Sequence, residues 1–203
     1  MRQLYEDVWA RLPPGGEREP FAFARRRAFL LESVAPGDDV LDLGCGEGDF
    51  CAVLAQAGAV PTGAEIARTA VDRARARHSG LRFDLVEPHG PLAFEDNTFD
   101  AVWASEVIEH VADTARWLSE VRRVLRPGGR LLVTTPFHGR IKNVAIALAR
   151  FERHFDPTGQ HLRFYTRRSL RDLLEAFGFG EVAIEAASGP PLLRESLHAR
   201  ARR

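Results

Sequence analysis

Three glycines at alternate positions, directly after a short apolar run, constrain this chain more than any other feature of its sequence. The run covers residues 40–43 and is interrupted only by Asp42. The glycines that follow it are Gly44, Gly46 and Gly48. Glycine adopts backbone angles that other residues avoid, and its missing side chain lets a ligand lie against the main chain. Because an apolar helical pattern over 50–57 comes next, we predict half of a nucleotide-binding unit, with Asp42 adding an acceptor at the end of the strand.

Composition bounds the class of protein. The 203 residues suffice for one domain with a substantial core and are too few for two ordinary domains. The 28 Lys and Arg residues balance 28 Asp and Glu residues, so no overall charge draws the chain to nucleic acid or to a membrane surface. No segment has the pattern of a membrane span or a signal sequence, and a disulfide between Cys45 and Cys51 would distort the turn. We therefore expect a cytoplasmic protein with reduced thiols.

Strand and helix patterns alternate along most of the chain. The expected strands are 39–43, 59–64, 81–86, 99–104, 130–135 and 181–187. Helical patterns separate most of them, and this spacing favours parallel strands joined by right-handed crossovers. The predicted fold class is α/β, a Rossmann-like, doubly wound, mostly parallel sheet of six or seven strands with helices on both faces.

The spacing of the glycines distinguishes between two classes of cofactor. Dinucleotide-binding folds space their glycines as G-x-G-x-x-G, whereas the third glycine, Gly48, comes one residue early for that pattern. Both classes use an acid at the end of the second strand to bind ribose hydroxyls, and Glu65 supplies it. The turn therefore favours a cofactor other than NAD.

Five motifs, in order, resemble those of the class I S-adenosylmethionine-dependent methyltransferases over about residues 25–179. They are VLDLGCGEG (40–48), Glu65, LAFEDNTFD (92–100), SEVIEHV (105–111) and RVLRPGG (123–129). Within that superfamily the chain is most similar to the ubiquinone-biosynthesis O-methyltransferase group. The resemblance implies S-adenosyl-L-methionine as cofactor and methyl transfer to a small-molecule acceptor, at oxygen, by a monomer or homodimer.

The same resemblance implies which residues hold the cofactor. The turn from Gly44 to Gly48 would hold the methionine moiety against bare backbone. Glu65 would accept hydrogen bonds from both ribose hydroxyls, and Ile66 would pack on the adenine face. Glu87 stands where the family has an aspartate that contacts the adenine amino group.

The resemblance implies two further contacts with the cofactor, at its sulfonium and at its carboxylate. Ser105 ends the fourth expected strand and would lie near the sulfonium. Arg25 corresponds to an arginine that pairs with the cofactor carboxylate in the ubiquinone group. Arg26 takes that role if the alignment shifts by one residue, and the alternative for Arg25 is a solvated helix charge.

A group of acids and histidines follows the fourth expected strand. In a helical turn Glu106, Glu109 and His110 would share one face, and two carboxylates with an imidazole suit a divalent cation. In metal-dependent members of the superfamily a histidine comparable to His161 completes the site. Mg²⁺ or another divalent cation bound there would lower the pKa of the acceptor hydroxyl. The alternative role for His110 is that of a catalytic general base without metal.

Three segments fall outside the core pattern of what we interpret as a single methyltransferase domain, 1–203. Residues 1–20 predict an N-terminal helix that would either act as a lid or simply pack on the core. Residues 137–166 predict an inserted helix and loop over the acceptor site. Residues 190–203 are polar and basic and predict a frayed helix or a solvated tail. The family's sheet ends in an antiparallel strand, which is either absent here or poorly patterned within 191–198. The edge of the sheet is therefore left open between these alternatives, and an unpaired edge would favour dimerisation there.

Three other functions compete with methylation of a small molecule. A metal-dependent RNA 2′-O-methyltransferase would explain the acid and histidine set, but the balanced charge argues against nucleic acid. A non-catalytic S-adenosylmethionine-binding protein would keep the glycines and Glu65 as they are. A dinucleotide oxidoreductase fits the glycine spacing least well.

Overall fold

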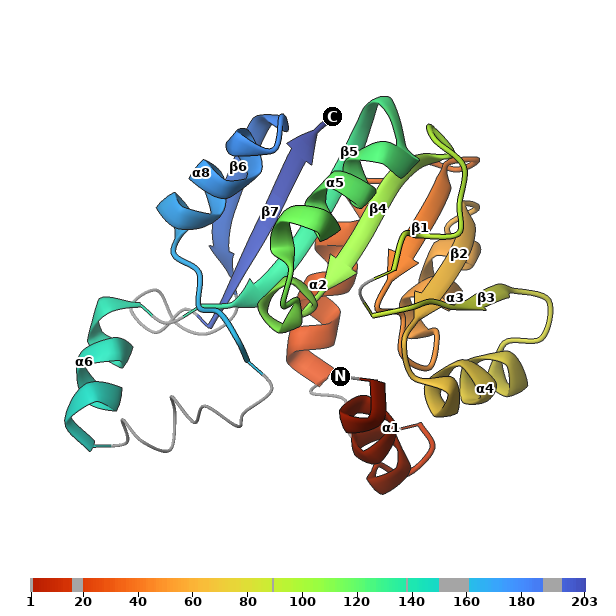
Figure 1. Ribbon diagram of the computed structural model, residues 1–203, viewed down its shortest axis with the longest axis horizontal. Coiled ribbons are helices and arrows are strands. Elements are labelled where there is room, and N and C mark those ends of the chain that lie inside the picture. Colours follow the sequence, from red (N-terminus) through yellow and green to blue (C-terminus); the bar gives the residue numbers. More distant parts are fainter. Residues whose placement is uncertain (1, 16–19, 89, 138, 150–160, 188–194) are drawn as a thin grey trace.

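A seven-stranded sheet runs through the centre of the described chain (Figure 1). The structure is a computed structural model and describes residues 2–15, 20–88, 90–137, 139–149, 161–187 and 195–203. The strands are β1 (Asp39–Leu43), β2 (Val60–Glu65), β3 (Arg82–Leu85), β4 (Phe99–Ser105), β5 (Leu125–Pro136), β6 (Gly180–Ala187) and β7 (Ser196–Arg202). Their order is β3-β2-β1-β4-β5-β7-β6, and β7 alone runs antiparallel to its neighbours. The predicted mostly parallel α/β fold is confirmed.

Helices cover both faces of this sheet. They are α1 (Arg2–Arg11), α2 (Pro20–Leu31), α3 (Asp49–Gln56), α4 (Arg68–Arg77), α5 (Thr114–Val124), α6 (Arg140–Ala149) and α8 (Arg167–Ala176), with a 3₁₀ turn η1 (Ile108–His110). In Figure 1, α5 and α8 lie in front of the sheet, where they share the larger apolar core. Residues of α2 and α3 form a second core with the opposite sides of the central strands.

The central strands contain apolar runs without alternation because both of their faces are covered. In β4, Val102 belongs to the core beneath α5, while Ala101 and Trp103 belong to the core beneath α2. In β5, Leu131 and Leu132 divide in the same way. Successive strand residues point to opposite faces, so a continuous apolar run is what a parallel sheet covered on both faces requires.

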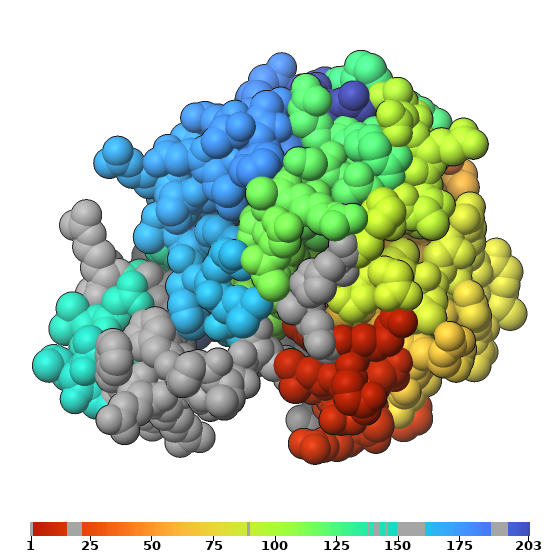
Figure 2. Space-filling model, in the orientation of Figure 1, coloured from red at the N-terminus to blue at the C-terminus, as the bar shows by residue number. Residues whose placement is uncertain are grey.

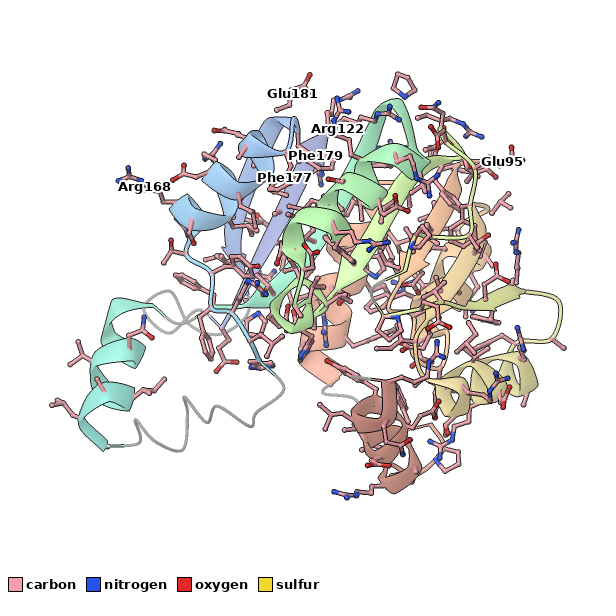
Figure 3. The ribbon with its side chains drawn as sticks, in the orientation of Figure 1. Glu95, Arg122, Arg168, Phe177, Phe179 and Glu181 are labelled. Carbon is pink, nitrogen blue, oxygen red and sulfur yellow. The ribbon has the colours of Figure 1, made fainter. Side chains whose placement is uncertain are left out.

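The end of α8 is tied to α5. The turn between α8 and β6 brings Phe177 and Phe179 against the α5 side of the core, as Figure 3 shows beside Arg122. The Arg122 guanidinium donates to the carbonyl of Gly178 at 3.5 Å. Phe179 is almost completely buried. This contact fixes the α8–β6 unit to the rest of the sheet on its front face.

The expectation of a frayed helix or solvated tail at the end of the chain is wrong for residues 196–202. These form β7, which pairs with both β5 and β6 and whose Leu197 is fully buried. The pattern was hidden because polar side chains occupy the opposite face of the strand. The His198 ring lies 5.0 Å from the Phe29 ring between centroids, and the Arg200 guanidinium lies 5.3 Å from the centre of the same Phe29 ring. These polar groups therefore serve as packing surface. Residues 188–194 lie outside the described part of the chain.

The inserted segment was expected to cover the acceptor site. Of this segment the structure describes α6, the residues just before it and residues 161–166. In Figure 1, α6 stands apart from the sheet, and the side chain of Leu148 is 84% exposed. Residues 150–160 lie outside the described part, so covering of the acceptor by this segment stays a prediction.

Leu197→Ala tests whether β7 is an interior strand. We expect the free energy of unfolding to fall by about 2–4 kcal/mol, because the change leaves a cavity between α8 and the sheet. Chemical denaturation measures this directly. Leu148→Ala is the control and should cost less than about 0.5 kcal/mol because its side chain faces solvent. Equal, small effects at both positions would contradict an interior β7.

Candidate functional site

The glycine turn has the backbone conformation that its sequence predicts. Gly44, Gly46 and Gly48 all have positive φ angles, 84°, 52° and 83°, which other residues rarely adopt. Space is also limited at each position. A Cβ on Gly44 would lie 2.5 Å from Val107, and one on Gly46 would lie 2.9 Å from the ring of Trp9. The turn therefore requires glycine both for its angles and for the close approach of neighbouring groups.

The carboxylate of Glu65 is bound entirely by backbone N–H groups at the end of β2. One oxygen accepts from Gly46 at 3.1 Å, and the other accepts from Ile66 at 2.7 Å and from Ala67 at 3.1 Å. Burial raises the pKa of the Glu65 carboxyl, and these N–H groups oppose that rise. The acid that the sequence singled out thus joins the glycine turn to the start of α4.

Two cavities adjoin the glycine turn and share Gly44. The first, which we call the Glu65 cavity, extends from Tyr5 and Glu65 past His110 to Trp117 on α5. The second, which we call the Arg26 cavity, lies on the other side of the turn. Its walls are Trp9, Phe23, Arg26, Gly44, Cys45, Gly46, Glu47, Asp49, Phe50 and Ser105.

Most of the predicted cofactor residues line these cavities. Gly44, Glu65, Ile66 and Glu87 border the Glu65 cavity, and Gly46 and Ser105 border the Arg26 cavity. Asp42 and Gly48 border neither of them. Gly48 instead caps the start of α3 in a left-handed conformation, where a Cβ would lie 2.6 Å from the Phe83 ring.

Arg26, and not Arg25, reaches the site. Arg25 is exposed, whereas Arg26 is half-buried and lines the Arg26 cavity. A guanidinium nitrogen of Arg26 lies 3.5 Å from the Ser105 hydroxyl and 4.0 Å from the Glu106 carboxylate. The one-residue alternative of the alignment therefore agrees with the geometry, because helical rotation turns neighbouring residues about 100° apart.

Glu87 borders the Glu65 cavity, but its carboxylate is engaged by another side chain. Its side chain is 70% exposed and pairs with the Arg2 guanidinium at 3.1 Å. Arg2 belongs to α1, so this pair joins α1 to the end of β3. Contact between Glu87 and a cofactor base stays a prediction.

Asp42 lies beneath the turn and not at its ligand-facing side. The carboxyl is fully buried and accepts a hydrogen bond from the Cys51 thiol at 3.3 Å. Burial raises the pKa of Asp42 to about 7, with the Cys51 hydrogen bond opposing the rise. The expected role as an acceptor for the ligand does not fit this placement.

Two threonines at the end of β5 hold the two acids that follow β4. The Thr134 hydroxyl donates to Glu106 at 2.9 Å, and the Thr135 hydroxyl donates to Glu109 at 3.0 Å. Ser105 joins the first pair, since its hydroxyl lies 3.0 Å from that of Thr134. Sequence reasoning missed both threonines. The available signal was their position at the carboxyl end of a strand next to the acidic segment.

The expected single helical face for the acids and His110 is wrong. Glu106 has a positive φ of 56° and precedes the short turn η1, which contains Glu109 and His110. Its carboxylate points toward Thr134 and Arg26, whereas that of Glu109 is buried beside His110. Burial raises the pKa of the Glu109 carboxyl, and the nearby charge of Glu106 raises it further.

Three of the four predicted metal ligands, Glu109, His110 and His161, come together, whereas Glu106 is not part of this group. One ligand atom from each lies within 4.8 Å of the others. The imidazole rings of His110 and His161 are 4.9 Å apart between centroids. One oxygen of Glu109 is buried without a hydrogen-bond partner among the described residues, 3.8 Å from His110 Nε2. Backbone N–H groups of Leu162 and Arg163 donate to the Glu109 carbonyl and hold the two segments together.

The comparison with protein families decides the class of protein. A family model described as a methyltransferase domain matches residues 16–183. The chain belongs to the class I S-adenosylmethionine-dependent methyltransferases. S-adenosylmethionine is therefore the cofactor, and the methyltransferase fold agrees with the seven-stranded sheet.

Curated relatives of this methyltransferase differ in the atom that they methylate. The chain is 35% identical over 150 residues to a ubiquinone biosynthesis O-methyltransferase of Cereibacter sphaeroides, covering 70% of the chain and 60% of the relative. It is 32% identical over 180 residues to the ubiquinone/menaquinone biosynthesis C-methyltransferase UbiE of Desulfotalea psychrophila, covering 77% and 72%. Methyltransferase GfsG of Streptomyces halstedii is 40% identical over 124 residues, 57% of the chain and 44% of GfsG. The chain spans less than two thirds of several such relatives.

Solved structures confirm the fold. Phosphoethanolamine N-methyltransferase 2 of Haemonchus contortus, in complex with S-adenosyl-L-methionine, superposes with a TM-score of 0.69 at 16% identity. The match covers 94% of the methyltransferase chain and 53% of that protein. None of the helices within the described residues has the length and apolarity to cross a membrane.

A pair of substitutions separates the two neighbouring arginines. We expect Arg26→Ala to raise the Kd for S-adenosylhomocysteine about tenfold, because it removes a half-buried guanidinium suited to the ligand carboxylate. Arg25→Ala should bind like the parent protein, since its side chain is exposed. Isothermal titration calorimetry measures both. A larger loss at Arg25 than at Arg26 would contradict the placement.

The buried Asp42 predicts a specific pH dependence of stability. Its pKa rises from 3.8 to about 7 on folding, so the folded state binds more protons in this range and loses stability as pH rises through it. We expect Asp42→Asn to raise the free energy of unfolding by about 1–3 kcal/mol at pH 8 and by less at pH 5. Urea unfolding at the two pH values measures the difference. A gain of the same size at both would exclude titration of Asp42 as its cause.

Proposed function

We propose that this methyltransferase transfers a methyl group to an oxygen of a small hydroxylated molecule. The observation that carries the proposal is the cluster of Glu109, His110 and His161 beside the cofactor cavities. Imidazole and carboxylate groups can hold a metal or remove a proton, and an oxygen nucleophile benefits from both. The relatives include both O- and C-methyltransferases, so they do not decide which atom of the acceptor is methylated. The proposal of oxygen therefore rests on the residues of the site.

The bound cofactor supplies an electrophilic methyl group on a sulfonium, so the protein's own task is mainly to position the two reactants. The glycine turn and Arg26 would hold the methionine moiety in the Arg26 cavity. Glu65 and Ile66 would hold the ribose and base in the Glu65 cavity. Gly44 lies where the cavities meet, and Glu106 and His110 line the Glu65 cavity near this junction. The acceptor oxygen would therefore approach between Gly44 and His110.

The donor set near this junction fits a metal ion. Three groups converge from two segments of the chain, and the unpartnered oxygen of Glu109 faces His110. Two imidazoles and one carboxylate favour Mn²⁺, Fe²⁺ or Zn²⁺ over Mg²⁺, which prefers oxygen ligands. An ion held there would lower the pKa of an acceptor hydroxyl. The sequence predicted Mg²⁺ or another divalent cation, and among these ions the proposed ligands favour the transition metals.

The proton of the acceptor hydroxyl also needs a destination. Without a metal ion, His110 would accept that proton as a general base, since it is half-buried and lines the Glu65 cavity. The two roles of His110 are alternatives, because a bound ion would occupy the lone pair that accepts the proton. Thr134 and Thr135 keep Glu106 and Glu109 in place beside this imidazole. Deprotonation and methyl transfer would thus use neighbouring groups on η1.

An acceptor screen tests the atom that is methylated. Purified protein would be incubated with S-adenosylmethionine and panels of phenols, aliphatic alcohols, amines and activated carbon acids, with mass spectrometry of the products. Methyl ethers from hydroxylated acceptors are the expected products. Products methylated only at carbon or nitrogen would overturn the proposal. Methylation of RNA oligonucleotides and not of small molecules would favour the RNA alternative.

Removal of the metal is expected to slow turnover. A chelator should lower the rate and added Mn²⁺ should restore it better than Mg²⁺, because the predicted ligands include two imidazoles. Binding of Mn²⁺ can be followed independently by electron paramagnetic resonance.

Matched variants assign the ligands. Glu109→Gln and His161→Ala should weaken Mn²⁺ binding by about tenfold or more, since each removes a direct ligand. Glu106→Gln should retain Mn²⁺ binding, because the Glu106 carboxylate points toward Thr134 and Arg26. Full activity in the chelator with no Mn²⁺ signal would exclude the metal and leave His110 as a base.

A further inference from the structure

The helix α1 lies against the cofactor-binding elements although none of its residues is buried. In Figure 2, α1 appears in red beside the yellow surface that α4 forms, and the two helices are in contact. The apolar residues Tyr5, Val8 and Trp9 of α1 are only partly buried, so α1 gains less from the hydrophobic effect than a core helix does. Directional contacts add to this packing.

Those contacts are hydrogen bonds from charged side chains to backbone groups of the cofactor site. The Arg2 guanidinium donates to the carbonyls of Ile66 at 3.0 Å and Val86 at 2.9 Å. The Glu6 carboxylate accepts from the N–H groups of Arg68 at 2.5 Å and Thr69 at 3.1 Å. Glu6 thus occupies the positive N-terminus of α4, directly after Ile66, and these hydrogen bonds lower its pKa.

A second set of contacts holds the residues just after α1. The backbone N–H of Gly15 donates to the carboxylate of Glu47 at 2.8 Å. Arg73 donates both to the carbonyl of Leu12 at 3.0 Å and to Glu47 at 3.2 Å. Glu47 lies within the glycine turn and is almost fully buried, so the turn itself anchors this segment.

Two aromatic residues of α1 face the two cavities. Tyr5 lines the Glu65 cavity, and Trp9 lines the Arg26 cavity. They are four residues apart and therefore lie on one face of the helix. The ring of Trp9 approaches Gly46 so closely that a Cβ on this glycine would lie 2.9 Å from it. One helix face thus spans both halves of the cofactor site.

We propose that Trp9 is a binding residue for the methionine half of S-adenosylmethionine, and that docking of α1 and binding of the cofactor stabilise each other. In the Arg26 cavity the guanidinium of Arg26 suits the ligand carboxylate. The indole of Trp9 suits the cationic ammonium and sulfonium groups, because aromatic faces attract cations. Two processes that share contacts are coupled in both directions, so groups that only anchor α1 influence cofactor affinity.

Glu6 and Asp7 make this coupling testable with matched variants. Glu6 anchors α1 but lines neither cavity, and Asp7 is an exposed neighbour whose carboxylate accepts from Gln3 within α1. By calorimetry we expect Trp9→Ala to raise the Kd for S-adenosylmethionine about tenfold. Glu6→Ala should raise the Kd roughly threefold, since it removes the contact with the N-terminus of α4. Asp7→Ala should bind like the parent protein.

Hydrogen exchange supplies a readout that needs no catalysis. In the parent protein the amides of α1 should exchange more slowly when S-adenosylmethionine is present, and Glu6→Ala should reduce this protection. The proposed role of α1 rests on the proposed binding of the cofactor in the two cavities. The affinity of Arg26→Ala for the cofactor tests that binding independently of α1. Unchanged affinity in both Trp9→Ala and Glu6→Ala, with binding lost in Arg26→Ala, would overturn the role of α1 alone. Unchanged affinity in all three variants would instead contradict the assignment of the Arg26 cavity.

Discussion

The carboxylate of Glu65 accepts hydrogen bonds from Gly46, Ile66 and Ala67 and thereby joins three parts of the site. It fixes the glycine turn after β1 to the end of β2 and to the start of α4. Gly46 lines the Arg26 cavity and Ile66 lines the Glu65 cavity, so the hydrogen bonds of Glu65 join the walls of the two cavities. A carboxylate has about four lone pairs for hydrogen bonds, so Glu65 could accept hydrogen bonds from ribose hydroxyls only with the lone pairs that these N–H groups leave free. Its structural task and the proposed binding of the ribose would therefore use the same carboxylate.

The parts of the fold that repeat a simple pattern were predictable from sequence. The glycine turn requires positive φ angles, and strands covered on both faces require apolar runs, so both leave direct marks on the residues. β7 leaves no such mark, because His198 and Arg200 serve as packing surface beside Phe29. Whether a polar side chain lies against a ring or in water is decided by tertiary contacts that a local pattern does not contain.

The site shows the same division between local and long-range information. The type and order of Glu65, Glu109 and His161 were predictable from motifs. The choice between Arg25 and Arg26 depended on the rotation of α2 about its axis, which an alignment fixes only to within a residue. The hydroxyls that hold the acids come from β5, about 28 residues further along the chain, and strand neighbours of this kind emerge only once the sheet is assembled.

The exposed anchors of α1 also have a consequence for the time that spent cofactor remains bound. Salt screens charges at the surface, so higher ionic strength would loosen Arg2 and Glu6 from their backbone partners. A looser helix would let S-adenosylhomocysteine leave sooner and would also hold fresh S-adenosylmethionine less firmly. Turnover would then be fastest at an intermediate salt concentration, where capture and departure are balanced. If α1 acts as proposed, the ionic strength of the solvent would thus set how long each form of the cofactor stays bound.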